Sequence, residues 1–165
     1  MELKEKVVYG TTGVCVVDSI EQKKIGRNIK QYYVLKPVAQ STSTVFLPVD
    51  NEELLAKAHR ILSVDEIENI VASVIDEQDE WVDNDAQRRT RFSEIISSGD
   101  RKRLLLMMRT LYNRRAQLSL SGKRLHISDE RAFNEVQRLI FDEFSVVLSI
   151  TQDDVINFLK ERLIK

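Results

Sequence analysis

The chain has 165 residues, of which 42% are hydrophobic, and a formal net charge of −1. This length fits one or two small domains, and five glycines and two prolines leave little room for disordered linkers. No segment approaches the ~20 apolar residues that span a bilayer, so we expect a soluble, intracellular protein. The single cysteine, Cys15, excludes an internal disulfide and is predicted to be a buried thiol in a reducing compartment.

The first part of the chain, residues 3–49, is predicted to form short β-strands. Runs of β-branched and aromatic residues alternate there with turn residues. Four or five strands in so short a segment predict a small barrel or a strongly bent sheet, because a flat sheet would leave long unprotected edges. The expected strands cover residues 7–9, 14–20, 29–35 and 45–47, with a hairpin turn over 22–28.

From residue 50 onward the spacing of apolar residues becomes helical. Ser63 and Glu66 form a capping-box pattern, and Gly99 followed by Asp100 predicts the end of one helix and the N-cap of the next. These patterns predict an α+β fold with a strand-built domain over residues 1–62 and an all-helical domain over residues 63–165. The expected helical segments are a short helix or turn over 54–62 and helices over 63–75, 79–98, 100–118, 128–147 and 151–163, with a loop over 119–127.

Charge is strongly segregated along the chain. Residues 50–84 hold eleven acidic residues and two basic ones, a net charge of −9, whereas residues 85–124 hold eleven basic residues and three acidic ones, a net charge of +8. Basic clustering on predicted helices is typical of a surface that meets a phosphate backbone. The alternative is that these charges serve solubility and ion pairing within the protein.

The sequence contains no motif of a familiar catalytic or metal site. It lacks a glycine-rich phosphate loop, a Gly-x-Ser-x-Gly elbow and a His-Glu-x-x-His pair. His59 and His126 do not stand at metal-ligand spacing from each other or from Cys15. The acidic residues over 76–85 lack the glycine and the terminal glutamate of a calcium loop. We therefore expect no enzyme activity, no cofactor and no metal ion.

Short segments along nearly the whole chain match one family in their order and spacing. In the first half they are Val7-Val8-Tyr9 with Gly13 and the strand 14–21, Tyr32-Tyr33-Val34-Leu35-Lys36, and Val45-Phe46-Leu47-Pro48-Val49 followed by Asn51-Glu52. In the second half they are Arg88-Arg89, Ser98-Gly99-Asp100, Leu111-Tyr112 with Arg114-Arg115, and Leu118-Ser119 followed by 128–139. Together they resemble the CarD-like/CdnL family of bacterial transcription regulators that bind RNA polymerase.

This resemblance implies that residues 1–62 form a Tudor-like or SH3-like barrel that docks on the β subunit of RNA polymerase. An exposed barrel edge could also pair with a strand of that partner. Phe46 stands near the position where family members often carry a basic residue, so this contact would be apolar or made elsewhere. The alternative is that Tyr33 and Phe46 fill the barrel core. The residues expected at the polymerase are Lys23, Tyr33, Thr44 and Phe46.

The resemblance also implies that residues 63–165 bind promoter DNA at the upstream edge of the melted bubble and stabilise the open complex. Arginine and lysine contacts to phosphate give affinity without base reading. Trp81, the only tryptophan, is expected to wedge into the minor groove, although its spacing from Arg88 is wider than usual for the family and a core role beside Phe92 suits it equally. The expected phosphate contacts are Arg88, Arg89, Arg91, Lys102, Arg109, Arg114, Arg115 and Lys123.

We therefore expect a monomeric, cytoplasmic regulator of transcription initiation that bridges the RNA polymerase β subunit and promoter DNA, with no membrane partner. The alternative is a protein-only adaptor, in which the barrel binds a partner and the basic helices pack on the protein's own acidic segments. An RNA-binding module is disfavoured, because the sequence does not place aromatic pairs on a sheet among basic neighbours in the usual manner.

Overall fold

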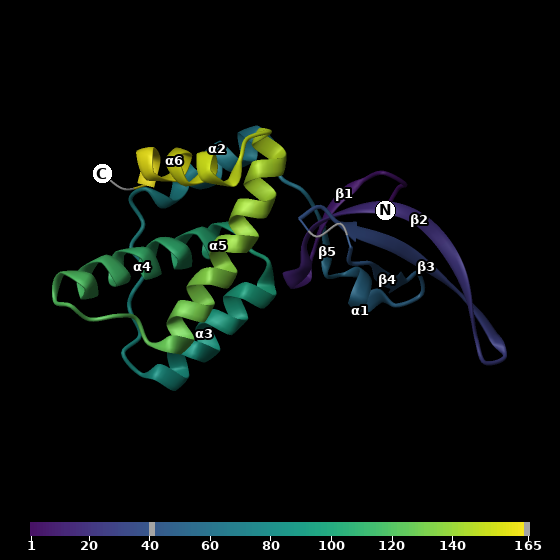
Figure 1. The fold of residues 1–165 in the computed structure, drawn as a ribbon, viewed down its shortest axis with the longest axis horizontal. Coiled ribbons are helices and arrows are strands. Elements are labelled where there is room, and N and C mark those ends of the chain that lie inside the picture. Colours follow the sequence, from purple (N-terminus) through teal and green to yellow (C-terminus); the bar gives the residue numbers. More distant parts are fainter. Residues whose placement is uncertain (40–41, 164–165) are drawn as a thin grey trace. The chain divides into compact units, whose positions relative to one another are not determined.

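The structure, a computed structural model, describes residues 1–39 and 42–163. The chain divides into two compact units, Met1–Leu62 and Ser63–Lys165. Within these ranges the five strands belong to the first unit and the long helices to the second (Figure 1). The predicted α+β class, with a sheet followed by a helical region, is confirmed.

The first unit is built on a five-stranded antiparallel sheet with the strand order β4-β3-β2-β1-β5. The long β2–β3 hairpin curves as it leaves the other strands (Figure 1). A register shift between Val17 and Ser19 interrupts the pairing of β2 with β3, and such bulges bend a strand. The elements are β1 (Lys6–Tyr9), η1 (Gly10–Thr12), β2 (Gly13–Ile25), β3 (Asn28–Pro37), β4 (Val45–Pro48), α1 (Glu52–Leu55) and β5 (Ala58–Arg60).

One face of this sheet carries the core of the unit. Strand alternation places Leu35 and Leu47 on this face, and both side chains are fully buried. Tyr33, which pairs with Leu47, packs against the same cluster, so the alternative of a core position applies to Tyr33. The buried members of the cluster are Val7, Cys15, Val17, Leu35 and Leu47.

Two details of the sheet differ from the sequence prediction. The hairpin turn is shorter than residues 22–28, because β2 continues to Ile25 and pairs with Asn28, which leaves Gly26 and Arg27 as the turn. Gly26 has φ 64°, a backbone conformation that favours glycine. The segment 54–62 is also not all helix or turn, since β5 pairs with β1 there. β5 has only three residues, among them His59 and Arg60, and these show no alternation of apolar and polar side chains. Its extended conformation therefore depends on pairing with β1.

Up to Leu163, where its description ends, the second unit is a bundle of five helices. They are α2 (Val64–Val74), α3 (Asp85–Ser98), α4 (Arg101–Leu120), α5 (Ile127–Leu148) and α6 (Gln152–Leu163). The helix α5 contacts each of the other four and is therefore the centre of the bundle. Ile140 and Phe144 of α5 are buried, as are Leu105, Met107 and Leu111 of α4, the helix that α5 contacts most extensively.

Most of the predicted helix ends are confirmed by hydrogen bonds. The Ser63 hydroxyl accepts from the Glu66 backbone N–H at 3.2 Å and the Glu66 carboxylate accepts from the Ser63 N–H at 2.8 Å, which completes the capping box. Asp100 accepts from the backbone N–H of Arg103 at 3.0 Å and begins α4. Gly99, with φ 64°, ends α3 in the left-handed conformation.

The predicted start of the second long helix, near residue 79, is wrong. Asn84 accepts a hydrogen bond from the Gln87 backbone N–H at 3.0 Å, so α3 begins at Asp85. An asparagine side chain at this position favours a cap over a helix interior. Residues 77–83 have no regular secondary structure, and Trp81 therefore lies before the helix and not on its apolar stripe.

We expect Leu105→Ala to lower the free energy of unfolding by about 2–5 kcal/mol, because the side chain is fully buried and its loss leaves a cavity. Leu120→Ala is a matched control on the same helix, since Leu120 is 90% exposed. It should change stability by no more than about 0.5 kcal/mol. Urea denaturation followed by circular dichroism measures both, and equal losses would contradict the packing described for α4.

Cys15 should resist thiol reagents in the folded protein. Its side chain is fully buried, and burial raises the pKa of the thiol to about 11, so little thiolate forms at about pH 8. Labelling with a maleimide should be slow in buffer and complete in denaturant. Rapid labelling of the folded protein would show that the sheet opens far more readily than its buried core implies.

Candidate functional site

On the face of the sheet opposite its core, the side chains of Lys23 and Tyr32 both contact Phe46. The Nζ atom of Lys23 lies 3.0 Å from the centre of the Phe46 ring, a cation–π contact. Tyr32 meets the same ring edge-on, with ring centres 6.5 Å apart. We call Lys23, Tyr32 and Phe46 the Lys23–Phe46 patch. Phe46 is 41% exposed, so the alternative that it fills the core is wrong.

The other two residues expected at the polymerase lie elsewhere on the sheet. Tyr33 points to the core face, as described above, and Thr44 is exposed just before β4. The strand β4 is at one end of the sheet order and pairs only with β3 among the strands described. Sequence reasoning missed Tyr32, although strand alternation implies that only one of two adjacent tyrosines can face the core.

In the helical unit, Arg88 is buried, with 3% of its surface exposed. Its Nε and Nη2 atoms donate to the two carboxylate oxygens of Asp129 at 2.9 and 2.8 Å. The Nη1 atom donates to the carbonyl oxygens of Val82 at 2.7 Å and Asp83 at 3.2 Å. A further bond at 2.7 Å from Nη2 to Asp85 lowers the pKa of that carboxyl.

These contacts engage all three guanidinium nitrogens of Arg88 and correct the expectation that this residue meets DNA. A buried guanidinium whose donors are engaged cannot also bind phosphate without leaving Asp129 uncompensated. Arg88 instead joins the start of α3 to the start of α5 and fixes the backbone at Val82 and Asp83. Arg101 makes a second ion pair with α5, from Nε and Nη2 to Glu143 at 3.0 and 3.2 Å.

Trp81 is partly buried and surrounded by specific contacts. The guanidinium carbon of Arg88 lies 4.6 Å from the indole ring centre, and that of Arg114 lies 5.1 Å from it. Phe92 meets the indole edge-on, with centroids 6.4 Å apart. The ring is thus held by two cations and one aromatic side chain while part of it stays accessible. This placement combines features of both roles expected for Trp81.

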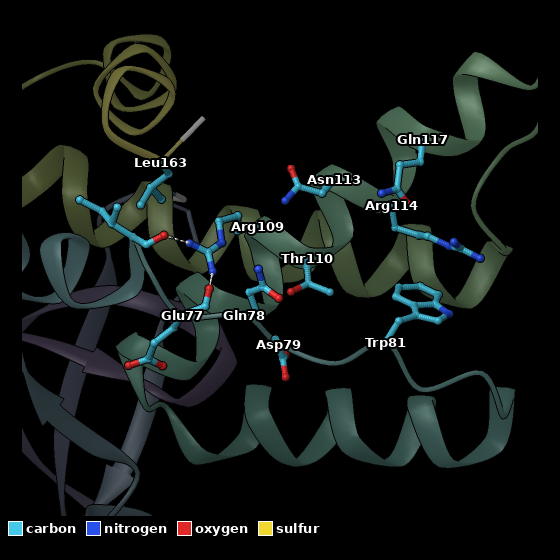
Figure 2. A pocket seen from close by; sticks show the side chains of 11 residues that line it. Glu77, Gln78, Asp79, Trp81, Arg109, Thr110, Asn113, Arg114, Gln117 and Leu163 are labelled. Atoms are coloured by element: carbon cyan, nitrogen blue, oxygen red, sulfur yellow. Dashed lines mark hydrogen bonds between the residues drawn. The ribbon is translucent and has the colours of Figure 1, made fainter. Parts of the chain in front are cut away.

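A pocket of about 410 Å³ lies between the segment that carries Trp81 and the helix α4 (Figure 2). Polar side chains of α4, among them Thr110, Asn113 and Gln117, line one side of it. Trp81 and Arg114 lie together at one end, and Arg109 reaches the segment at the other (Figure 2). The Nε atom of Arg114 is buried without a hydrogen-bond partner in the described part of the chain.

Three of the expected phosphate contacts are paired with the acidic segment that precedes α3. Arg91 forms an ion pair with Asp79, and Lys102 forms one with Glu77. Arg109 donates to the backbone oxygens of Val74, Ile75 and Glu77 and thereby satisfies carbonyls at the C-terminal end of α2. Internal pairing, the alternative raised for the segregated charges, therefore applies to Arg91 and Lys102.

The remaining expected cations are exposed on the helical unit. Arg89 lies on α3, and Lys123 lies in the loop between α4 and α5. The Nη1 atom of Arg115 lies 3.6 Å from Oε1 of Glu130, and the guanidinium carbon of Arg115 lies 4.4 Å from the centre of the Phe133 ring. Such half-exposed pairs are weak and exchange readily with solvent or a ligand.

No group of three or more histidine, cysteine, aspartate or glutamate side chains is placed to hold a metal ion within the described ranges. In the same part of the chain, no helix combines the length and the apolar character needed to cross a bilayer.

We expect Arg88→Ala to lower the free energy of unfolding by about 3–5 kcal/mol, because it leaves the buried carboxylate of Asp129 unpaired. The control is Arg115→Ala, which removes an exposed pair and should cost less than about 1 kcal/mol. Chemical denaturation of the full chain measures both. Equal, small losses would rule out Arg88 as a structural anchor.

Comparison with protein families bears on the N-terminal unit. Residues 2–59 match the family model described as CarD-like/TRCF RID domain. The match includes β1 to β4, α1 and the first residues of β5, and thus the whole Lys23–Phe46 patch. The resemblance of the helical unit to the same family stays a prediction. Residues 2–59 of this chain are a CarD-like/TRCF RID domain, as the resemblance predicted.

Proposed function

We propose that this chain is a bacterial, cytoplasmic regulator of transcription initiation that binds the β subunit of RNA polymerase and promoter DNA. The family of the N-terminal domain carries the first half of this proposal. A CarD-like RNA polymerase-interacting domain points to a transcription regulator whose partner is the polymerase. The second half depends on the surface of the helical unit.

The Lys23–Phe46 patch supports a specific polymerase contact. An aromatic ring that is 41% exposed offers apolar area to a partner, and the ammonium group of Lys23 beside it offers a charge. The strand β4, which carries Phe46, has no second strand partner in the described structure, so its free edge could pair with a strand of the β subunit. We propose that the patch and this edge together form the contact.

Exposed cations of the helical unit support contact with the DNA backbone. Arg89, Arg115 and Lys123 are exposed, and the partly accessible Trp81 is the candidate minor-groove wedge. Contacts of this kind bind phosphate in any sequence, and an inserted aromatic ring favours partly unstacked DNA. Arg88 is not part of this set because it is buried.

The proposed action on transcription is a shift between two states of the promoter. A protein that binds the polymerase and also prefers DNA beside a melted bubble has a higher affinity for the open complex than for the closed one. That difference in affinity stabilises the open complex by the same free energy. The result is activation or repression, depending on which step limits a given promoter.

The protein-only adaptor is a second candidate, favoured by the ion pairs of Arg91 with Asp79 and of Lys102 with Glu77. In that case the basic helices are satisfied internally and only the sheet binds a partner. Salt-dependent DNA binding by the full chain separates the two candidates, because internal pairing of every cation would leave none to displace counterions.

Lys23→Glu and Phe46→Ala should each weaken binding to a purified polymerase β-subunit fragment, by about tenfold or more if either is a central contact. Lys24→Glu is the matched control, because Lys24 is the neighbouring residue on the opposite face of β2. A titration by biolayer interferometry measures all three. Equal effects of Lys23→Glu and Lys24→Glu would show that only net charge matters.

Arg89→Ala and Lys123→Ala should each reduce DNA affinity in every sequence and lower the slope of log affinity against log salt by about 1. Lys57→Ala removes one exposed charge from the first unit and should leave the slope unchanged. Fluorescence anisotropy with a labelled duplex over a salt series measures these slopes. An unchanged slope for the first two variants would contradict the proposed phosphate contacts.

A further inference from the structure

The acidic segment before α3 lies on cations that are otherwise suited to phosphate. Asp79 pairs with Arg91 of α3, and Glu77 pairs with Lys102 of α4. Because Glu77 and Asp79 are two residues apart, the two cations meet the segment within about 7 Å of chain. We call these two side-chain pairs the acidic clasp. It brings the acidic region 50–84 into contact with the basic region 85–124.

Hydrogen bonds to backbone carbonyls hold both ends of the segment that carries the acidic clasp. Arg109 donates to the carbonyl oxygens of Val74, Ile75 and Glu77, and Figure 2 shows its guanidinium reaching the backbone of this segment. At the far end of the segment, Arg88 donates to the carbonyls of Val82 and Asp83. These two anchors bind backbone carbonyls, so they are retained when the carboxylates of Glu77 and Asp79 are neutralised.

Both cations of the acidic clasp are accessible to a ligand. The side chains of Arg91 and Lys102 are 38% and 42% exposed, whereas Glu77 is 43% exposed and Asp79 only 15%, so the Lys102–Glu77 pair is the more open of the two. Carboxylate and phosphate oxygens accept the same charge-assisted hydrogen bonds from arginine and lysine. A polyanion that approaches this surface thus competes directly with Glu77 and Asp79.

We infer that Arg91 and Lys102 are phosphate-binding residues and that Glu77 and Asp79 occupy them in the free protein as an internal competitor. The partner is the backbone of duplex DNA, so this inference rests on the proposed function. The carboxylates of Glu77 and Asp79 thereby weaken binding to DNA that is not held near the protein by polymerase. DNA brought close by polymerase reaches an effective concentration of about millimolar and displaces the two carboxylates.

The test uses the full chain with the double substitution Glu77→Gln and Asp79→Asn. These carboxamides keep the size of each side chain and remove the charge, and the backbone anchors at Arg109 and Arg88 are retained. Binding to a labelled duplex of arbitrary sequence, without polymerase, is measured by anisotropy over a salt series. Affinity should rise about threefold to tenfold, and the log–log salt slope should steepen by about 1.8 as two cations become available.

The matched control is Asp76→Asn with Glu80→Gln. It makes the same change of net charge in the same segment, but neither of these exposed carboxylates forms an ion pair within the described ranges. Its salt slope should stay at the wild-type value. An equal rise in DNA affinity in both double variants, or wild-type affinity in both, would overturn the internal competition. Neither result would contradict the proposed DNA binding. No binding by any of the three proteins at low salt would overturn the proposed DNA binding itself.

A double-mutant cycle adds a second readout. Arg91→Ala with Lys102→Ala should change DNA affinity little in the wild-type background, because the carboxylates already occupy these cations. The same pair should cause a loss of about threefold to tenfold in the Glu77→Gln, Asp79→Asn background. Equal losses in both backgrounds would contradict the competition.

Discussion

The helical unit depends on the buried ion pair of Arg88 with Asp129. The pair costs desolvation energy, and its geometry offsets that cost with two carboxylate bonds and two backbone carbonyls that accept from the same guanidinium. One side chain thereby joins α3 to α5, fixes the chain beside Trp81 and lies over the indole ring. The placement of Trp81 and of the end of the acidic segment at Val82 and Asp83 depends on this contact.

Contacts within the helical unit also explain why a basic region of the sequence does not correspond residue by residue to a nucleic-acid-binding surface. Of the cations expected at phosphate, Arg88 is buried, Arg109 binds backbone carbonyls, and Arg91 and Lys102 are paired with the acidic segment. Fewer of these cations are therefore exposed and unpaired than the sequence suggests. The net charge of −1 is the sum over these opposite regions, and the ion pairs between them neutralise part of the basic surface locally.

The sequence predicted the features that local chemistry determines. The capping box at Ser63, the stop at Gly99 and the cap at Asp100 each need only nearby residues, and all three are confirmed. The strand β5 and the late start of α3 were missed, because one depends on pairing with β1 and the other on an asparagine cap inside a polar run. The role of Arg88 was missed because its partner Asp129 lies 41 residues away.

The most direct test of the proposed function is the lifetime of a promoter open complex, measured with RNA polymerase and the full chain after addition of a competitor that traps free polymerase. The account predicts a longer lifetime with the protein than without it, and loss of this effect in the Lys23→Glu variant. An unchanged lifetime, at concentrations where the protein saturates the polymerase, would contradict the proposal that it stabilises the open complex. Such a result would favour the protein-only adaptor.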